Sequence, residues 1–296
     1  MRIIIFLLLI TPIGLFAQRN KILQKDYLVA CGENKVIIID PAKSTEAEPF
    51  IVWQWSVAEA TDLPAAYHKL LVPLDECKPV MQNKKLLLTS SGGATILLDI
   101  DSKNVTFYGR TPMAHSADIL PQNRIAVANS THPGGNSLEI YDINTPEKVL
   151  FKDSLYSGHG VVWNEKKDLL YVLGHSVLKA YALRDWKSLT PKLKLVKQWV
   201  LPEAGGHDLY MIDPANFIVS THHNVFKFNT KKETFDVFGP LSGKHNIKSV
   251  NYDAKRNKLV YTVAEESWWT QHIYSTQPDA RLHIPNIKLY KVRMAE

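Results

Sequence analysis

Four of the eleven histidines occupy matching places in the sequence. His115, His159, His207 and His245 each lie in a short segment that precedes a turn and a β-rich run. Imidazole titrates near neutral pH, so it can act as an acid or a base, and it is the commonest metal ligand in proteins. Because several histidines share one register, we expect them to converge on one site.

Counting from the turns extends this register to two lysines. The count that separates His159 from its turn leads to Lys248 in the last unit and falls near Glu76 and Lys78 in the second. The expected lining of the site is Lys78, His115, His159, His207 and Lys248, with Glu76 and His245 nearby. Ammonium groups in such a cavity favour a carboxylate ligand and lower the pKa of neighbouring imidazoles.

Three imidazoles on separate strands can also hold a divalent metal ion. The set His115, His159 and His207 would leave coordination positions open to a substrate, with Mn, Ca or Zn as the candidate ion. Lysines in the same cavity argue against a dense cation site. The alternative is that each histidine is structural, with its ring nitrogens bonded to the backbone, and both interpretations stay open at this point.

Residues 265–272 contain the adjacent tryptophans Trp268 and Trp269. Neighbouring side chains on a strand point to opposite faces, so at least one indole is expected to be exposed. An exposed tryptophan at the rim of a cavity offers a flat apolar face to a sugar ring or a cation. We therefore expect these residues to bind substrate; the alternative is that they pack between and at the edge of the β-sheets.

Short β-rich runs recur along the chain and predict the fold. The first run of each unit begins at residue 27, 86, 125, 169, 217 or 259, and a turn and a second run follow. Four-stranded propeller blades repeat every ~40–45 residues, which matches most of these intervals. The sequence therefore predicts an all-β fold, a single β-propeller of six four-stranded blades in preference to five or seven. A β-sandwich or barrel gives no reason for such a period.

The histidine-bearing segments come directly before the first runs. We expect each to form the innermost strand of its blade and to line the central channel. Glycines beside the histidines, at positions 158, 205 and 206, suit backbones that are crowded near an axis.

The N-terminal residues 1–17 have the pattern of a secretory signal peptide. Arg2 precedes an apolar run over residues 3–10, and Ala17 offers a small-residue cleavage site. Residues 18–296 would then form a single propeller domain that is periplasmic or secreted. The lipoprotein-like box at residues 28–31 is separated from the apolar run by charged residues, so no lipid anchor is expected. No later stretch reaches the ~18 apolar residues of a membrane span.

The composition is that of an ordinary globular protein, with 45% hydrophobic and 22% charged residues, and it excludes disorder, collagen and coiled coil. The net charge of +6 is scattered and carries no basic-aromatic motif, so nucleic acid is not an expected partner. An oligosaccharide or another small anionic ligand fits better, and the sequence does not indicate an oligomeric state. Cys31 and Cys77 are expected as buried free thiols rather than as a bridge.

Several segments resemble those of a family of secreted bacterial β-propellers of unknown function. They comprise residues 114–129, 158–163, 205–209, 247–250 and 267–270. The resemblance extends from residue 27 to residue 292. More distantly, the histidine-lined channel is similar in architecture to two kinds of propeller lyase, the oligogalacturonate lyases, which hold manganese with histidines, and the rhamnose–glucuronate lyases. This likeness implies carbohydrate chemistry, although a fold does not fix a function.

Together these observations predict a carbohydrate-active lyase that works by β-elimination on a uronate-containing oligosaccharide. A neutral His115 or His159 would remove the C5 proton of the uronate. Lys78 and Lys248, or a metal ion, would neutralise the charge that develops. The alternatives are a non-catalytic propeller that binds a ligand or a protein, a glycoside hydrolase, and a metal-dependent oxidoreductase or lactonase.

Overall fold

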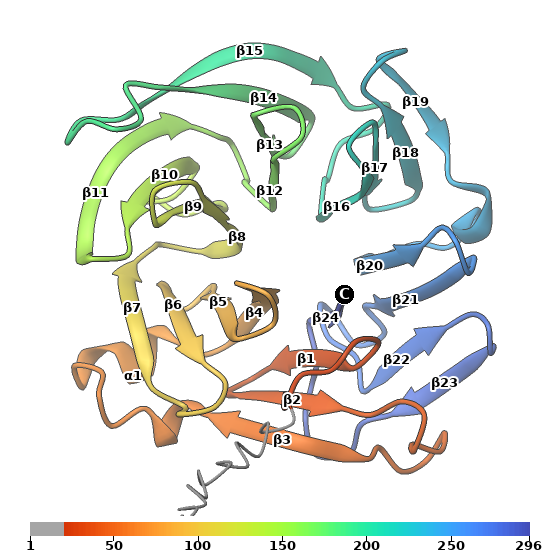
Figure 1. Ribbon diagram of the computed structural model, residues 1–296. Coiled ribbons are helices and arrows are strands. Elements are labelled where there is room, and N and C mark those ends of the chain that lie inside the picture. The colour runs from red at the N-terminus through yellow and green to blue at the C-terminus, as the bar shows by residue number, and fades with distance from the viewer. Residues whose placement is uncertain (1–20) are drawn as a thin grey trace, which may run out of the picture.

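The computed structural model describes residues 21–296 and consists of six four-stranded antiparallel sheets arranged in a ring (Figure 1). This confirms the predicted all-β propeller with six blades. The predicted signal peptide lies outside the described residues. No helix among residues 21–296 is long and apolar enough to cross a membrane.

Blades are numbered here from the sheet that holds the N-terminal strand. In blades 2 to 6 the chain runs from the innermost strand outward. Blade 2 comprises β4 (Leu74–Val80), β5 (Lys85–Ser90), β6 (Ala94–Asp99) and β7 (Val105–Arg110). Blade 3 comprises β8 (Ala114–Leu120), β9 (Arg124–Asn129), β10 (Ser137–Asp142) and β11 (Thr145–Ser154).

The remaining regular blades follow the same order. Blade 4 comprises β12 (Gly160–Asn164), β13 (Leu169–Leu173), β14 (Val177–Arg184) and β15 (Lys192–Val200). Blade 5 comprises β16 (Asp208–Asp213), β17 (Asn216–Ser220), β18 (Val225–Asn229) and β19 (Thr234–Val237). Blade 6 comprises β20 (Ile247–Asp253), β21 (Lys258–Val263), β22 (His272–Ser275) and β23 (Ala280–His283). The short helices are α1 (Ala66–Leu70) and two 3-10 turns, Val57–Glu59 and Gly239–Leu241.

Blade 1 joins the two ends of the chain and closes the ring. Its strands are β1 (Leu28–Gly32), β2 (Lys35–Ile39) and β3 (Ile51–Ser56), and its innermost strand is the C-terminal β24 (Lys291–Met294). Figure 1 shows β24 beside β1, with the C-terminus near the middle of the ring. Because the ring is closed, the inner strand of every blade packs against the inner strands of the two neighbouring blades. No blade then exposes its inner edge along its whole length.

The blades hold together because both faces of each sheet are buried. On β5, Leu86 and Leu88 pack in the cluster shared with blade 1, and Leu87 packs in the cluster shared with blade 3. This alternation follows from the two-residue period of a strand and explains why the second strands read as continuous apolar runs. Trp53 and Trp55 of β3 belong to the cluster between blades 1 and 2.

Side chains from one blade also satisfy the inner strand of the next. Ser116 Oγ accepts a hydrogen bond from the Val161 N–H at 3.2 Å, and Ser249 Oγ accepts one from the Val292 N–H at 3.1 Å. Backbone donors buried at the hub would otherwise be unpaired at a substantial cost in free energy. The polar residues of the inner strands therefore fix the blades relative to one another.

An ion-pair network of four residues crosses the hub. Arg293 of β24 makes paired contacts with both oxygens of Glu76 at 2.6 and 2.7 Å and of Asp208 at 2.6 and 2.9 Å. Lys291 lies 3.1 Å from Asp208 and 3.4 Å from Glu76. Glu76 lies on β4 and Asp208 on β16, so the closing strand ties blades 2 and 5 together across the channel.

Burial makes these charges depend on one another. The side chains of Lys291 and Glu76 are completely buried. Burial alone raises the pKa of Glu76, but the Arg293 and Lys291 charges outweigh it and lower that pKa to about 2. The same two cations lower the pKa of Asp208 against the effect of its burial. Two carboxylates and two cations thus balance, and removing one partner leaves an uncompensated buried charge.

We predict that Arg293→Ala strongly destabilises the propeller, because Glu76 and Asp208 would lose their bidentate partner. The expected loss is about 3–5 kcal/mol of unfolding free energy, measured by urea denaturation. The exposed ion pair of Lys197 with Glu233 provides a control, and Lys197→Ala should cost at most ~1 kcal/mol. Equal losses for the two variants would contradict a structural role for the network.

Candidate functional site

One position of the inner strand recurs in all six blades and carries a titratable side chain each time. In each blade this residue comes directly before the point from which the inner strand pairs with the second strand residue by residue. The pairs at that point are Glu76↔Thr89, Ser116↔Ala128, Gly160↔Leu173, Asp208↔Ser220, Ser249↔Thr262 and Lys291↔Cys31. The residues at this position, called the hub-ring position below, are Asp75, His115, His159, His207, Lys248 and Tyr290. The pairing register shifts at Asp75, His115 and Lys248, and such bulges re-aim side chains.

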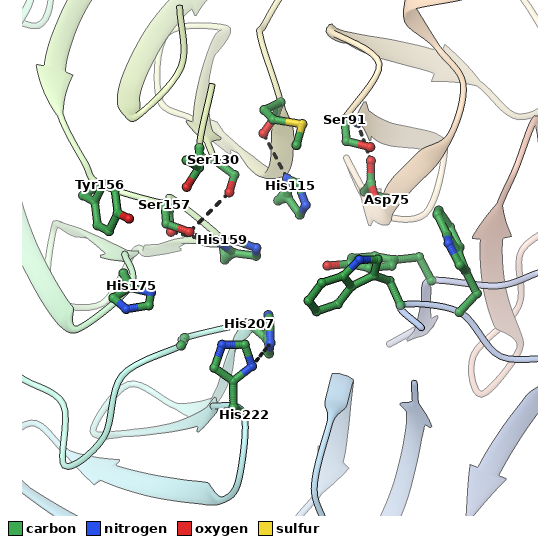
Figure 2. A pocket seen from close by; sticks show the side chains of 17 residues that line it. Asp75, Ser91, His115, Ser130, Tyr156, Ser157, His159, His175, His207 and His222 are labelled. Atoms are coloured by element: carbon green, nitrogen blue, oxygen red, sulfur yellow. Dashed lines mark hydrogen bonds between the residues drawn. The ribbon is translucent and has the colours of Figure 1, made fainter. Parts of the chain in front are cut away.

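Five of these six side chains line one cavity of about 410 Å³ at one mouth of the channel; Lys248 is the exception. Its volume lies within the roughly 300–1,000 Å³ of small-molecule sites. The loops above the hub complete the lining with Tyr156, His175, His222, Trp268 and Trp269, among others. Figure 2 shows the labelled histidines turned toward this space from successive blades.

His115 and His159 are held in the same way. The Nδ1–H of His115 donates to the Met113 carbonyl at 2.9 Å, and that of His159 donates to the Ser157 carbonyl at 2.9 Å. In both rings this leaves Nε2 without its proton, as a hydrogen-bond acceptor or base. The ring centroids lie 4.3 Å apart. Burial lowers the pKa of His115 to about 4 and also lowers that of His159, so both rings are neutral at pH 7.

Lys248 lies directly behind the cavity wall and contacts two residues that line it. Its Nζ donates to Nε2 of His207 at 3.0 Å and lies 4.6 Å from the centre of the Trp268 ring. Burial, together with the charge of Lys291, lowers the pKa of Lys248 to about 7. Burial and the Lys248 charge lower the pKa of His207 to about 2. Near neutral pH, Lys248 is therefore the member of the pair that gains or loses a proton, and His207 stays neutral.

The second ring nitrogen of His207 is an unsatisfied donor. Because Nε2 accepts from Lys248, the proton of the neutral ring lies on Nδ1. That atom is buried and has no hydrogen-bond partner within the described part of the chain. An unpaired buried donor costs about 1–3 kcal/mol.

Asp75 supplies an acid to the same cavity. Its Oδ2 accepts a hydrogen bond from the Ser91 N–H, and the side chain is 2% exposed. Burial raises the pKa of Asp75 to about 7, so a large fraction of the carboxyl groups carries a proton at neutral pH. A protonated carboxyl beside neutral imidazoles is an arrangement that can transfer protons in both directions.

Glycine at position 205 makes room for one wall of the cavity. Its φ of +86° is strained for other residues, and a Cβ there would lie only 1.9 Å from the His222 ring. His222 in turn contacts His207, with Nδ1 at 2.9 Å from its Nε2. Gly205, which we expected to relieve crowding near the axis, therefore leaves room for a second imidazole ring beside His207.

Three of the predicted site residues lie elsewhere. We expected Lys78 to share a cavity with the histidines, but it lines a different cavity of about 380 Å³. Its Nζ donates to the Val161 carbonyl at 2.8 Å. Glu76 is fully buried in the ion-pair network. His245 is exposed outside the cavity, and its Nδ1 donates to the His223 carbonyl at 2.8 Å. The predicted residues that do meet at the cavity are His115, His159, His207, Trp268 and Trp269, with Lys248 behind them.

The predicted lining did not include Asp75 or Tyr290, although one signal was present for Asp75. His115, His159, His207 and Lys248 precede the second strand of their blades by nine or ten residues, and Asp75 stands at the same spacing before Lys85. Counting back from the irregular turn at residues 81–83, where φ is positive three times in succession, led to Glu76 and Lys78 instead. Tyr290 has no such signal, because its blade is completed by the far end of the chain.

The comparison with known families identifies the group to which the chain belongs. Residues 16–295 match a family described as "Family of unknown function (DUF6528)". The chain belongs to this family. Since the match covers nearly the whole sequence, the resemblance to a propeller family of unknown function is confirmed. A comparison with curated proteins finds no match. Nothing in these findings supports the more distant likeness to propeller lyases.

The histidines do not form a ready metal site as they are placed. Among residues 21–296, no group of three or more His, Cys, Asp or Glu side chains is positioned to hold a metal ion. His207 already uses its Nε2 lone pair to accept from Lys248. A metal at His115, His159 and His207 stays a prediction, and binding would require Lys248 to move or to lose its proton.

Metal analysis of protein purified without chelators tests this point. The Lys248–His207 contact predicts clearly substoichiometric Mn, Ca and Zn, and Lys248→Met should not lower the metal content. One equivalent of a divalent ion that is lost in His115→Ala would contradict this expectation and would establish the metal site.

The Lys248 ammonium also predicts a pH-dependent signal. Because its pKa is about 7, raising the pH through neutrality removes the charge that faces Trp268. Tryptophan fluorescence should therefore show a transition with a midpoint near pH 7 that is absent in Lys248→Met. Asp75 titrates in the same range, so Asp75→Asn is the control and should keep the transition. A transition that survives in Lys248→Met would contradict this assignment.

Proposed function

We propose that the protein is a secreted or periplasmic carbohydrate-active propeller. Its cavity would bind a uronate-containing oligosaccharide and cleave it by β-elimination. The observation that carries this proposal is the pairing of free imidazole nitrogens with a protonated carboxyl, Asp75, in one cavity beside two tryptophans. The former groups serve for proton transfer and the latter for stacking on a sugar ring.

The elimination requires a base and an acid, and both are available. Nε2 of His115 or His159 takes the C5 proton of the uronate, and the electron pair of that C–H bond forms the C4=C5 double bond. The bond between C4 and the glycosidic oxygen breaks, and the leaving oxygen takes the proton of Asp75. The base ends as imidazolium and the acid as carboxylate, so a proton exchange with water restores both.

The surroundings of the cavity favour a bound carboxylate. Asp75 is the one carboxyl among the described residues that line the cavity, and its pKa of about 7 leaves a large fraction of it uncharged at neutral pH. His207 lines the cavity, and the Lys248 ammonium contacts its Nε2 from behind the cavity wall. This charge would stabilise the enolate-like transition state through His207. The proposal assigns that role to Lys248 alone, because Lys78 lines the other cavity.

The site favours this chemistry over glycoside hydrolysis. Hydrolases of the common kind use two carboxyl groups that flank the scissile bond. Asp75, Glu76 and Asp118 lie on neighbouring inner strands and could supply such a pair. Among these three, Asp75 alone lines the cavity, since Glu76 is paired with Arg293 and Asp118 lines the cavity of Lys78.

Binding without catalysis is a second candidate, and the pKa of His115 favours it. A pKa of about 4 leaves the ring unprotonated but makes it a weak base for a carbon acid. In that case the same cavity would bind an anionic sugar and release it unchanged.

An assay with uronate oligosaccharides separates the two candidates. Elimination creates an unsaturated product that absorbs in the ultraviolet, and we expect its formation with at least one member of a uronate panel. His115→Ala or His159→Ala should lower kcat by about 10²–10⁴-fold, as should Asp75→Asn, because each removes a proton-transfer group.

The controls address folding and ligand binding. His68→Ala, on α1 and outside the cavity, should leave kcat unchanged. Binding measured by calorimetry with no product from any uronate would favour the non-catalytic candidate. Full activity in Asp75→Asn and in both histidine variants would contradict the mechanism.

A further inference from the structure

A second exposed aromatic residue lines the cavity on a different blade from the tryptophans. Tyr156 is 61% exposed and lies in the loop between blades 3 and 4, whereas Trp268 is 53% exposed and lies in blade 6. Both line the same cavity. Figure 2 shows Tyr156 and His175 on the side of the cavity away from Asp75 and Ser91. The proton-transfer groups of the hub therefore lie below a mouth that has an aromatic ring on each side.

The backbone around Tyr156 is fixed although its ring is exposed. Leu155 is buried in the core between blades 3 and 4, and its N–H donates to the Asn136 carbonyl at 2.9 Å. On the other side, the Ser157 N–H donates to Oδ1 of Asn136 at 2.9 Å. The Tyr156 carbonyl accepts from the His175 N–H at 3.0 Å. A ring that is exposed on so rigid a turn needs little ordering when it binds a ligand.

Backbone hydrogen bonds join the loop of His175, beside Tyr156, to the segment that leads into blade 5. The His175 carbonyl accepts from the N–H groups of Gly205 and Gly206, at 2.7 and 3.0 Å, which joins the rims of blades 4 and 5. The His175 ring packs edge-on against Tyr156, with centroids 5.4 Å apart, and supports it from one side.

From this arrangement we infer that Tyr156, supported by His175, forms a second sugar-stacking subsite. The ligand is then an oligosaccharide long enough to reach from Trp268 to Tyr156 across the cavity that both residues line, with its central residue over the hub. This inference rests on the proposed carbohydrate function, and it adds that the site recognises an internal stretch of a chain rather than a single sugar. Tyr156 is a binding residue here and takes no part in proton transfer.

The test compares how uronate ligands of different lengths bind to the protein. Binding of mono-, di-, tri- and tetra-uronates is measured by calorimetry, with product formation followed in parallel. Affinity should rise with length until both aromatic rings are covered. Tyr156→Ala should weaken binding of the longest ligand about three- to ten-fold, the magnitude of one aromatic contact. It should leave binding of the monosaccharide unchanged, and Tyr156→Phe should retain the affinity for the longest ligand.

Phe50→Ala is the matched control, because it removes an exposed aromatic ring, 46% exposed, on the outer part of blade 1. It should bind every ligand as the unmodified protein does. Equal loss for short and long ligands in Tyr156→Ala, or no dependence on length, would overturn the subsite. Product formation that does not respond to Tyr156→Ala would overturn the subsite and leave the proposed elimination intact. Length-dependent binding through Tyr156 without product would retain the subsite and reject the elimination.

Discussion

The four-residue ion-pair network at the hub is the interaction on which the rest of the structure depends. Arg293 and Lys291 reach the channel from the C-terminal strand and bind carboxylates from blades 2 and 5. Through Lys291 and Arg293 the strand that closes the ring is bound to blade 5, two blades away, as well as to β1. Glu76 and Asp208 directly follow the hub-ring residues Asp75 and His207, so the same contacts that hold the hub together also fix the base of the cavity.

The network also explains how a cavity full of titratable groups can keep them uncharged. Its carboxylates are paired with Arg293 and Lys291, so Glu76 and Asp208 do not stabilise imidazolium in the cavity. Burial therefore dominates, and it lowers the pKa values of His115 and His207 while it raises that of Asp75. Neutral bases and a protonated acid can then coexist a few residues from four buried charges. Such a cavity can transfer protons, and it can bind an anion because little negative charge repels it.

The blade count and the convergence of the histidines could be predicted from the sequence because they rest on local signals. Apolar runs and turns mark the strands, and His115, His159 and His207 share one distance from them. Depth within the channel was harder to predict. Glu76 and Lys78 lie one and three residues past the hub-ring position, and this offset places Glu76 in the ion pairs and Lys78 in the other cavity. Lys291 and Arg293 could not be assigned to the hub, since only closure of the ring brings β24 beside β1.

In the proposed mechanism the free Nε2 atoms of His115 and His159 face the ligand. Nitrogen NMR of protein with labelled histidines measures this directly. Without ligand, both rings should show the Nδ1–H form, as their bonds to Met113 and Ser157 require. Addition of a uronate oligosaccharide should shift the Nε2 signals of these two rings and leave that of the exposed His132 unchanged. Nε2–H forms in the free protein, or Nε2 signals that do not respond to any bound uronate, would contradict the claim.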